Sequence, residues 1–408
     1  MRIERPKDIE RFGAIRFGTL QKIFELDSGM ENGDPAAYSS VIQPISNMDL
    51  HDIEQDMAIV VPVKNERLKL IEGVLCGIPH PCLIIIVSNS PREPVDRFGM
   101  EEDALEEFCA FTRKRAMIVH QKDPAFARLF DKVDYTNILD DDGQVRDGKA
   151  EGMIIGTLLS KLAGKKYVGF VDADNYFPGA VEEYVRAYAA GFAMSSSPYA
   201  MVRIAWHSKP KIVESKLFFR KWGRTSTRTN ALLNKLLAHY TGFETEIVKT
   251  GNAGEHAMTM DLALSLDYAS GYAIEPYHII NLMEKFGGIY ETAMTEIMKR
   301  YKVEVYQVES RNPHLHEAGD EDHIEQMSYL AMQTIYHSPV CPSALKSELY
   351  KKMVDMSFVK KGEEPDRPHY FPPLRRIDMD MVMRCIGETP FVKQMGGTTI
   401  VHTRTNLH

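Results

Sequence analysis

The sequence predicts an α/β protein built on a parallel β-sheet, because short apolar runs alternate with amphipathic stretches along the chain. The runs MAIVVPV at 57–63, LIIIVSN at 83–89 and AMIVH at 116–120 are continuous, which is typical of strands buried on both faces. Helical patterns lie between and after them, near 67–77, 100–113 and 148–162. This order predicts parallel strands joined by right-handed helical crossovers.

The later elements follow the same pattern before the chain becomes mostly helical. YVGFVDAD at 167–174 predicts a fourth strand that ends in Asp172 and Asp174, and Pro178 predicts the start of a helix. EVYQVE at 304–309 is strand-like. Beyond residue 320 we expect helices over 324–336 and 343–356, followed by a proline-rich surface linker at 363–376.

Length, composition and charge argue against several classes of protein. The 408 residues, 44% of them hydrophobic, suffice for one large α/β domain with a helical part or for two domains. A net charge of -8 argues against a nucleic-acid surface. We expect no signal peptide, because the N-terminus lacks an apolar segment, and no membrane partner, because no run approaches roughly 18 apolar residues. Five scattered cysteines without a CxxC pair favour a reducing, cytoplasmic location.

Polar clusters follow the four predicted strands, at 64–66, 88–90, 120–123 and 172–174. Ligands of parallel sheets bind at the carboxyl ends of the strands. We therefore expect a binding site at this edge, the alternative being four ordinary solvated turns.

Asp172 and Asp174 are candidate metal ligands. Strand alternation would put both carboxylates on one face, where a hard divalent ion such as Mg²⁺ or Mn²⁺ relieves their repulsion. His314 and His316 share a face at period two, and either could complete the site. Two histidines with carboxylates could also indicate zinc. The alternatives are an acidic pair capping the turn before Pro178 and ordinary loop histidines.

Three further segments suggest contacts with anions. Lys149 stands at a glycine-flanked helix start, where backbone N–H groups favour phosphate, although a simple glycine N-cap would look the same. The turn at 250–256 could place Glu255 or His256 against a ligand, or be a plain tight turn.

The stretch 203–228 holds eight Lys or Arg against one acid, Glu214. Within it, Arg224 stands beside hydroxyl residues, a set suited to phosphate plus carboxylate. This indicates an anionic acceptor, the alternative being a solvated basic face.

These motifs together resemble the mannosyl-3-phosphoglycerate synthase family, in order from about residue 10 to about 340. They are AIVVPVKNE, IIIVSNS, HQKDPA, DGKAEGM, YVGFVDADNYFPGAVEEYVRAYAAGF, KWGR, TGNAGEHAMTM and RNPHLHE. The resemblance implies a GT-A, Rossmann-like nucleotide-sugar-binding core with a mainly helical C-terminal part. It implies a retaining enzyme that transfers mannose from GDP-mannose to 3-phosphoglycerate with Mg²⁺ or a similar ion. The product would feed synthesis of the compatible solute mannosylglycerate.

The resemblance also implies roles for individual residues. The donor pocket would comprise Pro62, Lys64, Asn65, Glu66, Ser88, Gln121, Lys122, Lys149, Asp172 and Ala173. Asp172, Asp174 and His316 would hold the metal, and Gly223, Arg224, Thr225 and Ser226 would clamp the acceptor. Thr225-Ser226-Thr227 stands where the family commonly has Val-Ser-Glu or Val-Thr-Glu, a departure that affects only the third clamp position.

The sequence pattern and the motifs together predict the organisation of the chain and its mechanism. We expect a lead-in over 1–56 packed on the core, a core over 57–320 and a helical region with a tail over 321–408. The donor half of the core would span about 57–195 and the acceptor half about 196–320. We expect a homodimer, and front-face attack with Asp174, Glu255 and Arg224 as catalytic residues, Glu255 orienting the sugar or stabilising its cation.

The sequence also has to be weighed against three other functions. A glucosyl-3-phosphoglycerate synthase would differ in its donor. A sugar-nucleotide pyrophosphorylase would need a glycine-rich loop after the first strand, which Pro62 to Glu66 lacks. A nucleotide-sugar sensor would not need Asp172, Asp174 and Lys149 together.

Overall fold

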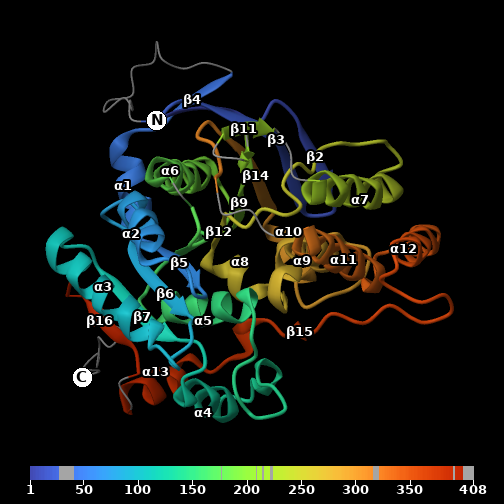
Figure 1. The fold of residues 1–408 in the computed structure, drawn as a ribbon. Coiled ribbons are helices and arrows are strands. Elements are labelled where there is room, and N and C mark those ends of the chain that lie inside the picture. The colour runs from blue at the N-terminus through green and yellow to red at the C-terminus, as the bar shows by residue number, and fades with distance from the viewer. Residues whose placement is uncertain are drawn as a thin grey trace.

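The computed structural model describes residues 1–26, 41–175, 177–207, 209–213, 216–220, 224–315, 321–388 and 391–397 (Figure 1). Within them a 12-stranded mixed sheet has the order β16-β7-β6-β5-β8-β12-β9-β14-β3-β1-β4, with β2 paired to β3. Its strands are β1 (Arg2–Glu4), β2 (Ile9–Phe12), β3 (Ile15–Glu25), β4 (Ile42–Pro44), β5 (Met57–Val63), β6 (Leu83–Ser88), β7 (Ala116–His120), β8 (Tyr167–Phe170), β9 (Tyr199–Trp206), β12 (His256–Thr259), β14 (Val303–Ser310) and β16 (Lys393–Met395).

Helices and two small sheets surround this sheet. The helices are α1 (Asn47–Gln55), α2 (Leu68–Gly77), α3 (Arg97–Thr112), α4 (Pro124–Lys132), α5 (Lys149–Leu162), α6 (Pro178–Met194), α7 (Arg224–Thr241), α8 (Met260–Ser265), α9 (Ile274–Phe286), α10 (Thr295–Arg300), α11 (Glu321–His337), α12 (Ser343–Asp355) and α13 (Met379–Glu388). The small sheets pair β10 (Lys209–Val213) with β11 (Lys216–Arg220) and β13 (Tyr268–Ala269) with β15 (Tyr370–Phe371).

The first half of the sheet is parallel, as predicted: β5 pairs with β6 and β8, and β6 pairs with β7, all in parallel. The sheet as a whole is mixed, because β12 runs antiparallel to both β8 and β9. After β10, β11 and α7, the chain begins β12 at the edge of the sheet where β8 and β9 end. This reversal brings the start of β12 to the carboxyl end of β8.

Alternation along β5 divides the interior into two cores. Ile59 and Val61 belong to the core formed with α1, α2, α3 and α6, whereas Val60 belongs to the core formed with α5, α8 and α9. Gly156 of α5 allows the closest approach, because a Cβ atom there would lie 2.3 Å from Val60 Cγ1. Figure 1 shows the two groups of helices on opposite faces of the sheet.

The C-terminal region is mainly helical, and the predicted α/β class is confirmed. The proline-rich stretch 363–376 is not a plain surface linker, because Phe371 and Leu374 are fully buried and β15 pairs with β13. Both ends of the described chain join the sheet, β3 beside β14 and β16 beside β7. The domain boundaries remain a prediction. In the described residues, each helix is too short or too polar to serve as a membrane span.

Candidate active site

The register of the parallel strands brings their polar carboxyl ends together. Val63 lies opposite Ser88, and Ser88 lies opposite His120. The backbone N–H of Asn65 donates to Ser90 Oγ at 2.7 Å, and His120 Nε2 lies 2.9 Å from the Ser90 carbonyl. The clusters after β5, β6 and β7 therefore form one continuous surface, as the sequence predicted.

The buried carboxylate of Glu101 accepts hydrogen bonds from two serines of this surface. Ser88 Oγ and Ser90 Oγ donate to the two oxygens of Glu101 at 2.5 and 2.6 Å. Ser88 is fully buried, so it positions the loop that follows β6. Glu101 belongs to a helix whose sequence is rich in Glu, and no pattern in that sequence distinguishes this residue from its neighbours.

The loop before α5 is held against the end of β7. Gln121 Nε2 donates to the Arg146 carbonyl at 2.8 Å, and Lys122 Nζ lies 3.2 Å from Asp147 Oδ2. Asn89 Nδ2 donates to Asp147 Oδ1 at 2.8 Å. These contacts fix the position at which Lys149 enters the helix. Gln121 and Lys122, both predicted site residues, thus lie at the expected edge.

Lys149 joins two parts of the site. Its Nζ lies 2.5 Å from Asp172 Oδ1 and 3.0 Å from Glu275 Oε1, and its side chain is 9% exposed. Burial alone would lower the pKa of Lys149, but the carboxylates of Asp172 and Glu275 outweigh it and hold the pKa well above its usual value. Lys149 is therefore a fixed positive charge. Glu275 was not predicted, because it comes from α9, far away in sequence.

The two aspartates lie in a turn, so the prediction that strand alternation aligns them is wrong. β8 ends at Phe170, and Asn175 Nδ2 then donates to the Asp172 carbonyl at 2.9 Å, closing the turn. Burial raises the pKa of Glu66 to about 7, and the nearby carboxylate of Asp174 adds to that shift. Asp172 thus contacts Lys149, while Asp174 lies near the residues that follow β5.

Glu255 reaches the same turn from β12. His256 pairs with Phe170, so Glu255 lies opposite the point at which β8 ends. Its Oε1 accepts a hydrogen bond from Asn175 Nδ2 at 3.1 Å, and its side chain is fully buried. The preceding Gly254 leaves room for this approach, since a Cβ there would lie 2.6 Å from Asp172 Oδ2, which contacts Lys149.

Three histidines are candidates for this region, and the two that the structure describes differ in position. Burial lowers the pKa of His256 well below its usual value, and its ring contacts Phe170 and His278 inside the core. His314 follows β14, stacks on Trp206 with centroids 4.4 Å apart, and places Nδ1 3.9 Å from Glu255 Oε1. His314 therefore borders the site, whereas His256 supports the sheet. His316 lies outside the described residues.

The predicted acceptor clamp is partly described. Gly223 lies outside the described residues, and Arg224 begins α7 without a described side chain. Thr225 is buried and Ser226 half-buried. Asn230 Oδ1 on the same helix accepts from the Gly251 N–H at 2.7 Å. The start of α7 is thus anchored to the turn that carries Gly254 and Glu255.

Arg203, the first of the eight basic residues, is a structural residue. It is fully buried, and its Nη2 donates to the carbonyls of Thr250 at 2.8 Å and Glu275 at 2.9 Å. The suggestion that this residue belongs to a basic acceptor face is wrong, because its guanidinium satisfies backbone carbonyls beneath the site.

Carboxylate oxygens are the ligands that Mg²⁺ and Mn²⁺ prefer. Asp172 and Glu275 contact the Lys149 ammonium, Glu255 accepts a hydrogen bond from Asn175 in the same turn, and Asp174 lies near Glu66. No group of three or more His, Cys, Asp or Glu in the described residues could hold a metal ion. His316, the predicted further ligand, lies outside them.

Comparison with known proteins decides the family. A family model for mannosyl-3-phosphoglycerate synthase matches residues 5–386. The chain belongs to this family. The family's synthase from Pyrococcus furiosus is 45% identical over 386 residues, covering 95% of this chain and 97% of that protein. The synthase from Aeropyrum pernix is 35% identical over 373 residues, covering 91% and 94%.

The chain is also similar to a solved structure. Glucosyl-3-phosphoglycerate synthase from Mycobacterium tuberculosis, in complex with Mn²⁺, UDP-glucose and phosphoglyceric acid, is 16% identical. It covers 82% of this chain and 95% of its own, with a TM-score of 0.48. Membership of the mannosyl-3-phosphoglycerate synthase family identifies the chain as a glycosyltransferase and confirms the resemblance inferred from the motifs.

Proposed function

We propose that this chain transfers mannose from GDP-mannose to 3-phosphoglycerate with retention of the anomeric configuration, using Mg²⁺ or Mn²⁺. The product, mannosyl-3-phosphoglycerate, would serve synthesis of the compatible solute mannosylglycerate. One observation carries the proposal: Lys149 and the surrounding carboxylates lie together at the carboxyl edge of the parallel strands. They do so in a chain that is 45% identical to a relative named for this activity.

The donor diphosphate would bind at the start of α5. Backbone N–H groups at a helix N-terminus favour anions, and the Lys149 ammonium adds a full charge there. Asp172, Asp174 and His316 would hold the divalent ion, which when bound offsets the negative charge on the leaving diphosphate. The nucleotide would lie along the ends of β5, β6 and β7, against Pro62, Lys64, Asn65, Glu66, Gln121 and Lys122, while the buried Ser88 supports the loop after β6.

Glu255 would orient the transferred sugar. Asn175 fixes its carboxylate from one side, and the carboxylate of Asp172 is held by Lys149. Because both carboxylates are engaged by neighbouring groups, we favour front-face attack over a covalent glycosyl intermediate. The acceptor hydroxyl would pass its proton to an oxygen of the departing phosphate. Gly223, Arg224, Thr225 and Ser226 would hold the acceptor phosphate and carboxylate.

A transfer assay tests the proposal directly. Purified protein is incubated with 3-phosphoglycerate, Mg²⁺ and either GDP-mannose or UDP-glucose, and the anomeric configuration of the product is read by NMR. We expect an α-linked mannosyl product from GDP-mannose. Asp174→Asn should lower kcat at least a hundredfold while the circular-dichroism spectrum and Tm stay near wild type, since it removes an ion ligand rather than packing.

Three outcomes would contradict the proposal. Full activity after EDTA treatment would exclude the divalent ion, and a β-linked product would exclude retention. Turnover of UDP-glucose in preference to GDP-mannose would assign the chain to the glucosyl alternative.

A further inference from the structure

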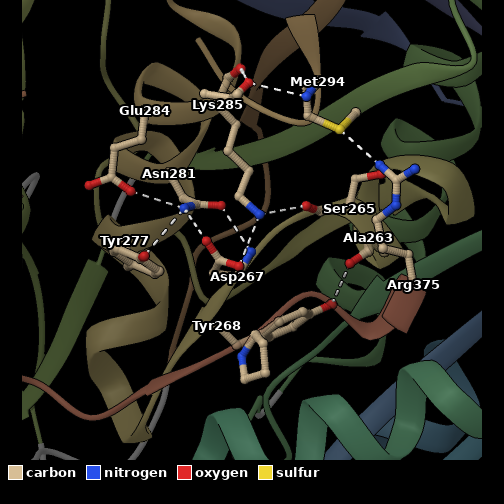
Figure 2. Close-up of polar contacts among 12 residues, drawn as sticks. Ala263, Ser265, Asp267, Tyr268, Tyr277, Asn281, Glu284, Lys285, Met294 and Arg375 are labelled. Carbon is tan, nitrogen blue, oxygen red and sulfur yellow. Dashed lines mark hydrogen bonds and ion pairs between the residues drawn. The ribbon is translucent and has the colours of Figure 1, made fainter. Parts of the chain in front are cut away.

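A cavity of about 640 Å³ lies between α9 and the segment that precedes α13, away from the residues assigned above. Its volume falls within the roughly 300–1,000 Å³ typical of small-molecule sites. The polar residues that line it include Asp267, Asn281, Glu284, Lys285, Arg375 and Arg376. Figure 2 shows Asp267, Asn281, Glu284 and Lys285 turned toward one another.

The floor of this α9 cavity is a rigid polar network. Lys285 Nζ lies 2.9 Å from Asp267 Oδ1 and donates to the Ser265 carbonyl at 2.9 Å. Asn281 Nδ2 lies 3.1 Å from Asp267 Oδ2 and 3.0 Å from Glu284 Oε2. Each carboxylate oxygen has two lone pairs, so these carboxylates can still accept hydrogen bonds from hydroxyl groups. A floor of this kind suits a polyhydroxylated molecule.

The rim of the α9 cavity carries two adjacent cations. Arg375 and Arg376 close the short 3₁₀ turn Leu374–Arg376, which the buried Leu374 anchors, and both side chains are exposed. Arg375 Nη1 contacts the thioether sulfur of Met294 at 2.9 Å, a weak acceptor (Figure 2). Within the described residues, neither guanidinium forms a salt bridge to a carboxylate. Both arginines line the cavity, and guanidinium groups bind phosphate through charge-assisted hydrogen bonds.

We propose that the α9 cavity is a second ligand site, which binds a small phosphorylated polyol with its phosphate on Arg375 and Arg376 and its hydroxyls on Asp267 and Glu284. The site is distinct from the catalytic one. Glu275, which contacts Lys149, and Lys285 are ten residues apart on α9, or about 15 Å at 1.5 Å per residue. The same helix therefore touches both sites, which gives a bound ligand a rigid connection to the Lys149 charge. The proposal does not depend on the identity of the sugar donor.

Calorimetric titration with mannose 6-phosphate tests the site. We expect saturable binding to wild type that persists in the presence of excess 3-phosphoglycerate, because the catalytic site is elsewhere. The double variant Arg375→Gln/Arg376→Gln should weaken binding at least tenfold. Arg367→Gln, an exposed arginine outside the cavity, is the matched control and should bind as wild type.

A second pair of measurements tests whether the floor of the cavity contacts the hydroxyl groups of the ligand. Glu284→Gln should weaken mannose 6-phosphate binding severalfold but leave the binding of inorganic phosphate unchanged, because only the polyol contacts the floor. Absence of binding at millimolar concentration would overturn the proposal. So would displacement by 3-phosphoglycerate together with unchanged binding in the double arginine variant, which would place the probe in the catalytic site.

Discussion

The ammonium of Lys149 is held by two carboxylates that come from different parts of the chain. The helix start and flanking glycine indicate a phosphate-binding lysine, but its ammonium lies between Asp172 and Glu275. Opposite charges at hydrogen-bond distance in a buried site hold the ammonium in place before any ligand arrives. Glu275 could not be predicted, because the contact joins residues more than a hundred positions apart and carries no local signature.

Arg224 carries the first prediction at the scale of single residues. If its guanidinium clamps the acceptor phosphate, Arg224→Ala should raise the KM for 3-phosphoglycerate at least tenfold, about 1.4 kcal/mol, because charge-assisted bidentate contacts are strong. Arg224→Lys should restore only part of this, since lysine lacks the planar fork. Steady-state kinetics with GDP-mannose held saturating provide the measurement.

Arg228, one turn further along α7, is the matched control for that experiment. Its side chain is exposed, and exposed ion pairs contribute only about 0–1 kcal/mol, so Arg228→Ala should leave the KM unchanged. The advantage of 3-phosphoglycerate over glycerate should shrink in Arg224→Ala alone. An equal loss for both acceptors, or a weakened affinity for GDP-mannose, would show that Arg224 serves the donor or the fold.

The secondary-structure elements were easier to predict than their ends. The apolar runs at 57–63 and 116–120 are β5 and β7 without change, because a strand buried on both faces has a continuous apolar sequence. The fourth strand was predicted four residues too long: β8 stops at Phe170, since Asn175 turns the chain at Asp172. Side-chain capping of that kind depends on tertiary position, which periodicity does not reveal.

Gly156 provides a prediction for the packing of α5 on β5. Alanine is favoured over glycine in a helix by about 1 kcal/mol, but here its Cβ would lie 2.3 and 2.7 Å from the two methyl groups of Val60. Rotating Val60 cannot relieve both contacts, and overpacking costs roughly 1–3 kcal/mol. Gly156→Ala should therefore lower the free energy of unfolding, measured by urea denaturation, and lower kcat by displacing Lys149.

Gly387 in α13 is the control that separates the effect of helix propensity from that of overpacking. A Cβ there would have no neighbour within 4 Å, so Gly387→Ala should leave stability unchanged or raise it by up to about 1 kcal/mol. A stabilised Gly156→Ala protein would mean that α5 can move away from the sheet at little cost.

The mixed sheet unites segments that the sequence could not place relative to one another. The alternating first half predicts parallel strands, but nothing local indicates that β12 runs antiparallel between β8 and β9. The site depends on that reversal, because it brings Glu255 to the Asp172 turn. The lead-in and the C-terminal strand likewise join opposite ends of the sheet through β3 and β16. Such pairings join distant segments and depend on the complete fold.

A buried carboxyl at the α1–α6 contact should give the whole molecule a measurable pH dependence of stability. Burial raises the pKa of Glu54 to about 7 from 4.5, with Arg186 opposing the shift and Glu182 adding to it. The folded state then holds a proton that the unfolded state releases between these values. The stability contributed by this group is complete below pH 4.5 and lost as the pH rises to about 7.

Glu54→Gln should remove that dependence. Between pH 4 and pH 8, the free energy of unfolding of wild type should fall by about 3 kcal/mol relative to that of the variant, because each pKa unit corresponds to about 1.4 kcal/mol. Urea denaturation at pH 4, 5.5 and 8 provides the measurement. Glu107→Gln, at an exposed position, should follow wild type at every pH. A constant difference between Glu54→Gln and wild type would mean that the Arg186 guanidinium keeps Glu54 ionised throughout, and that the contact between α1 and α6 is a true ion pair.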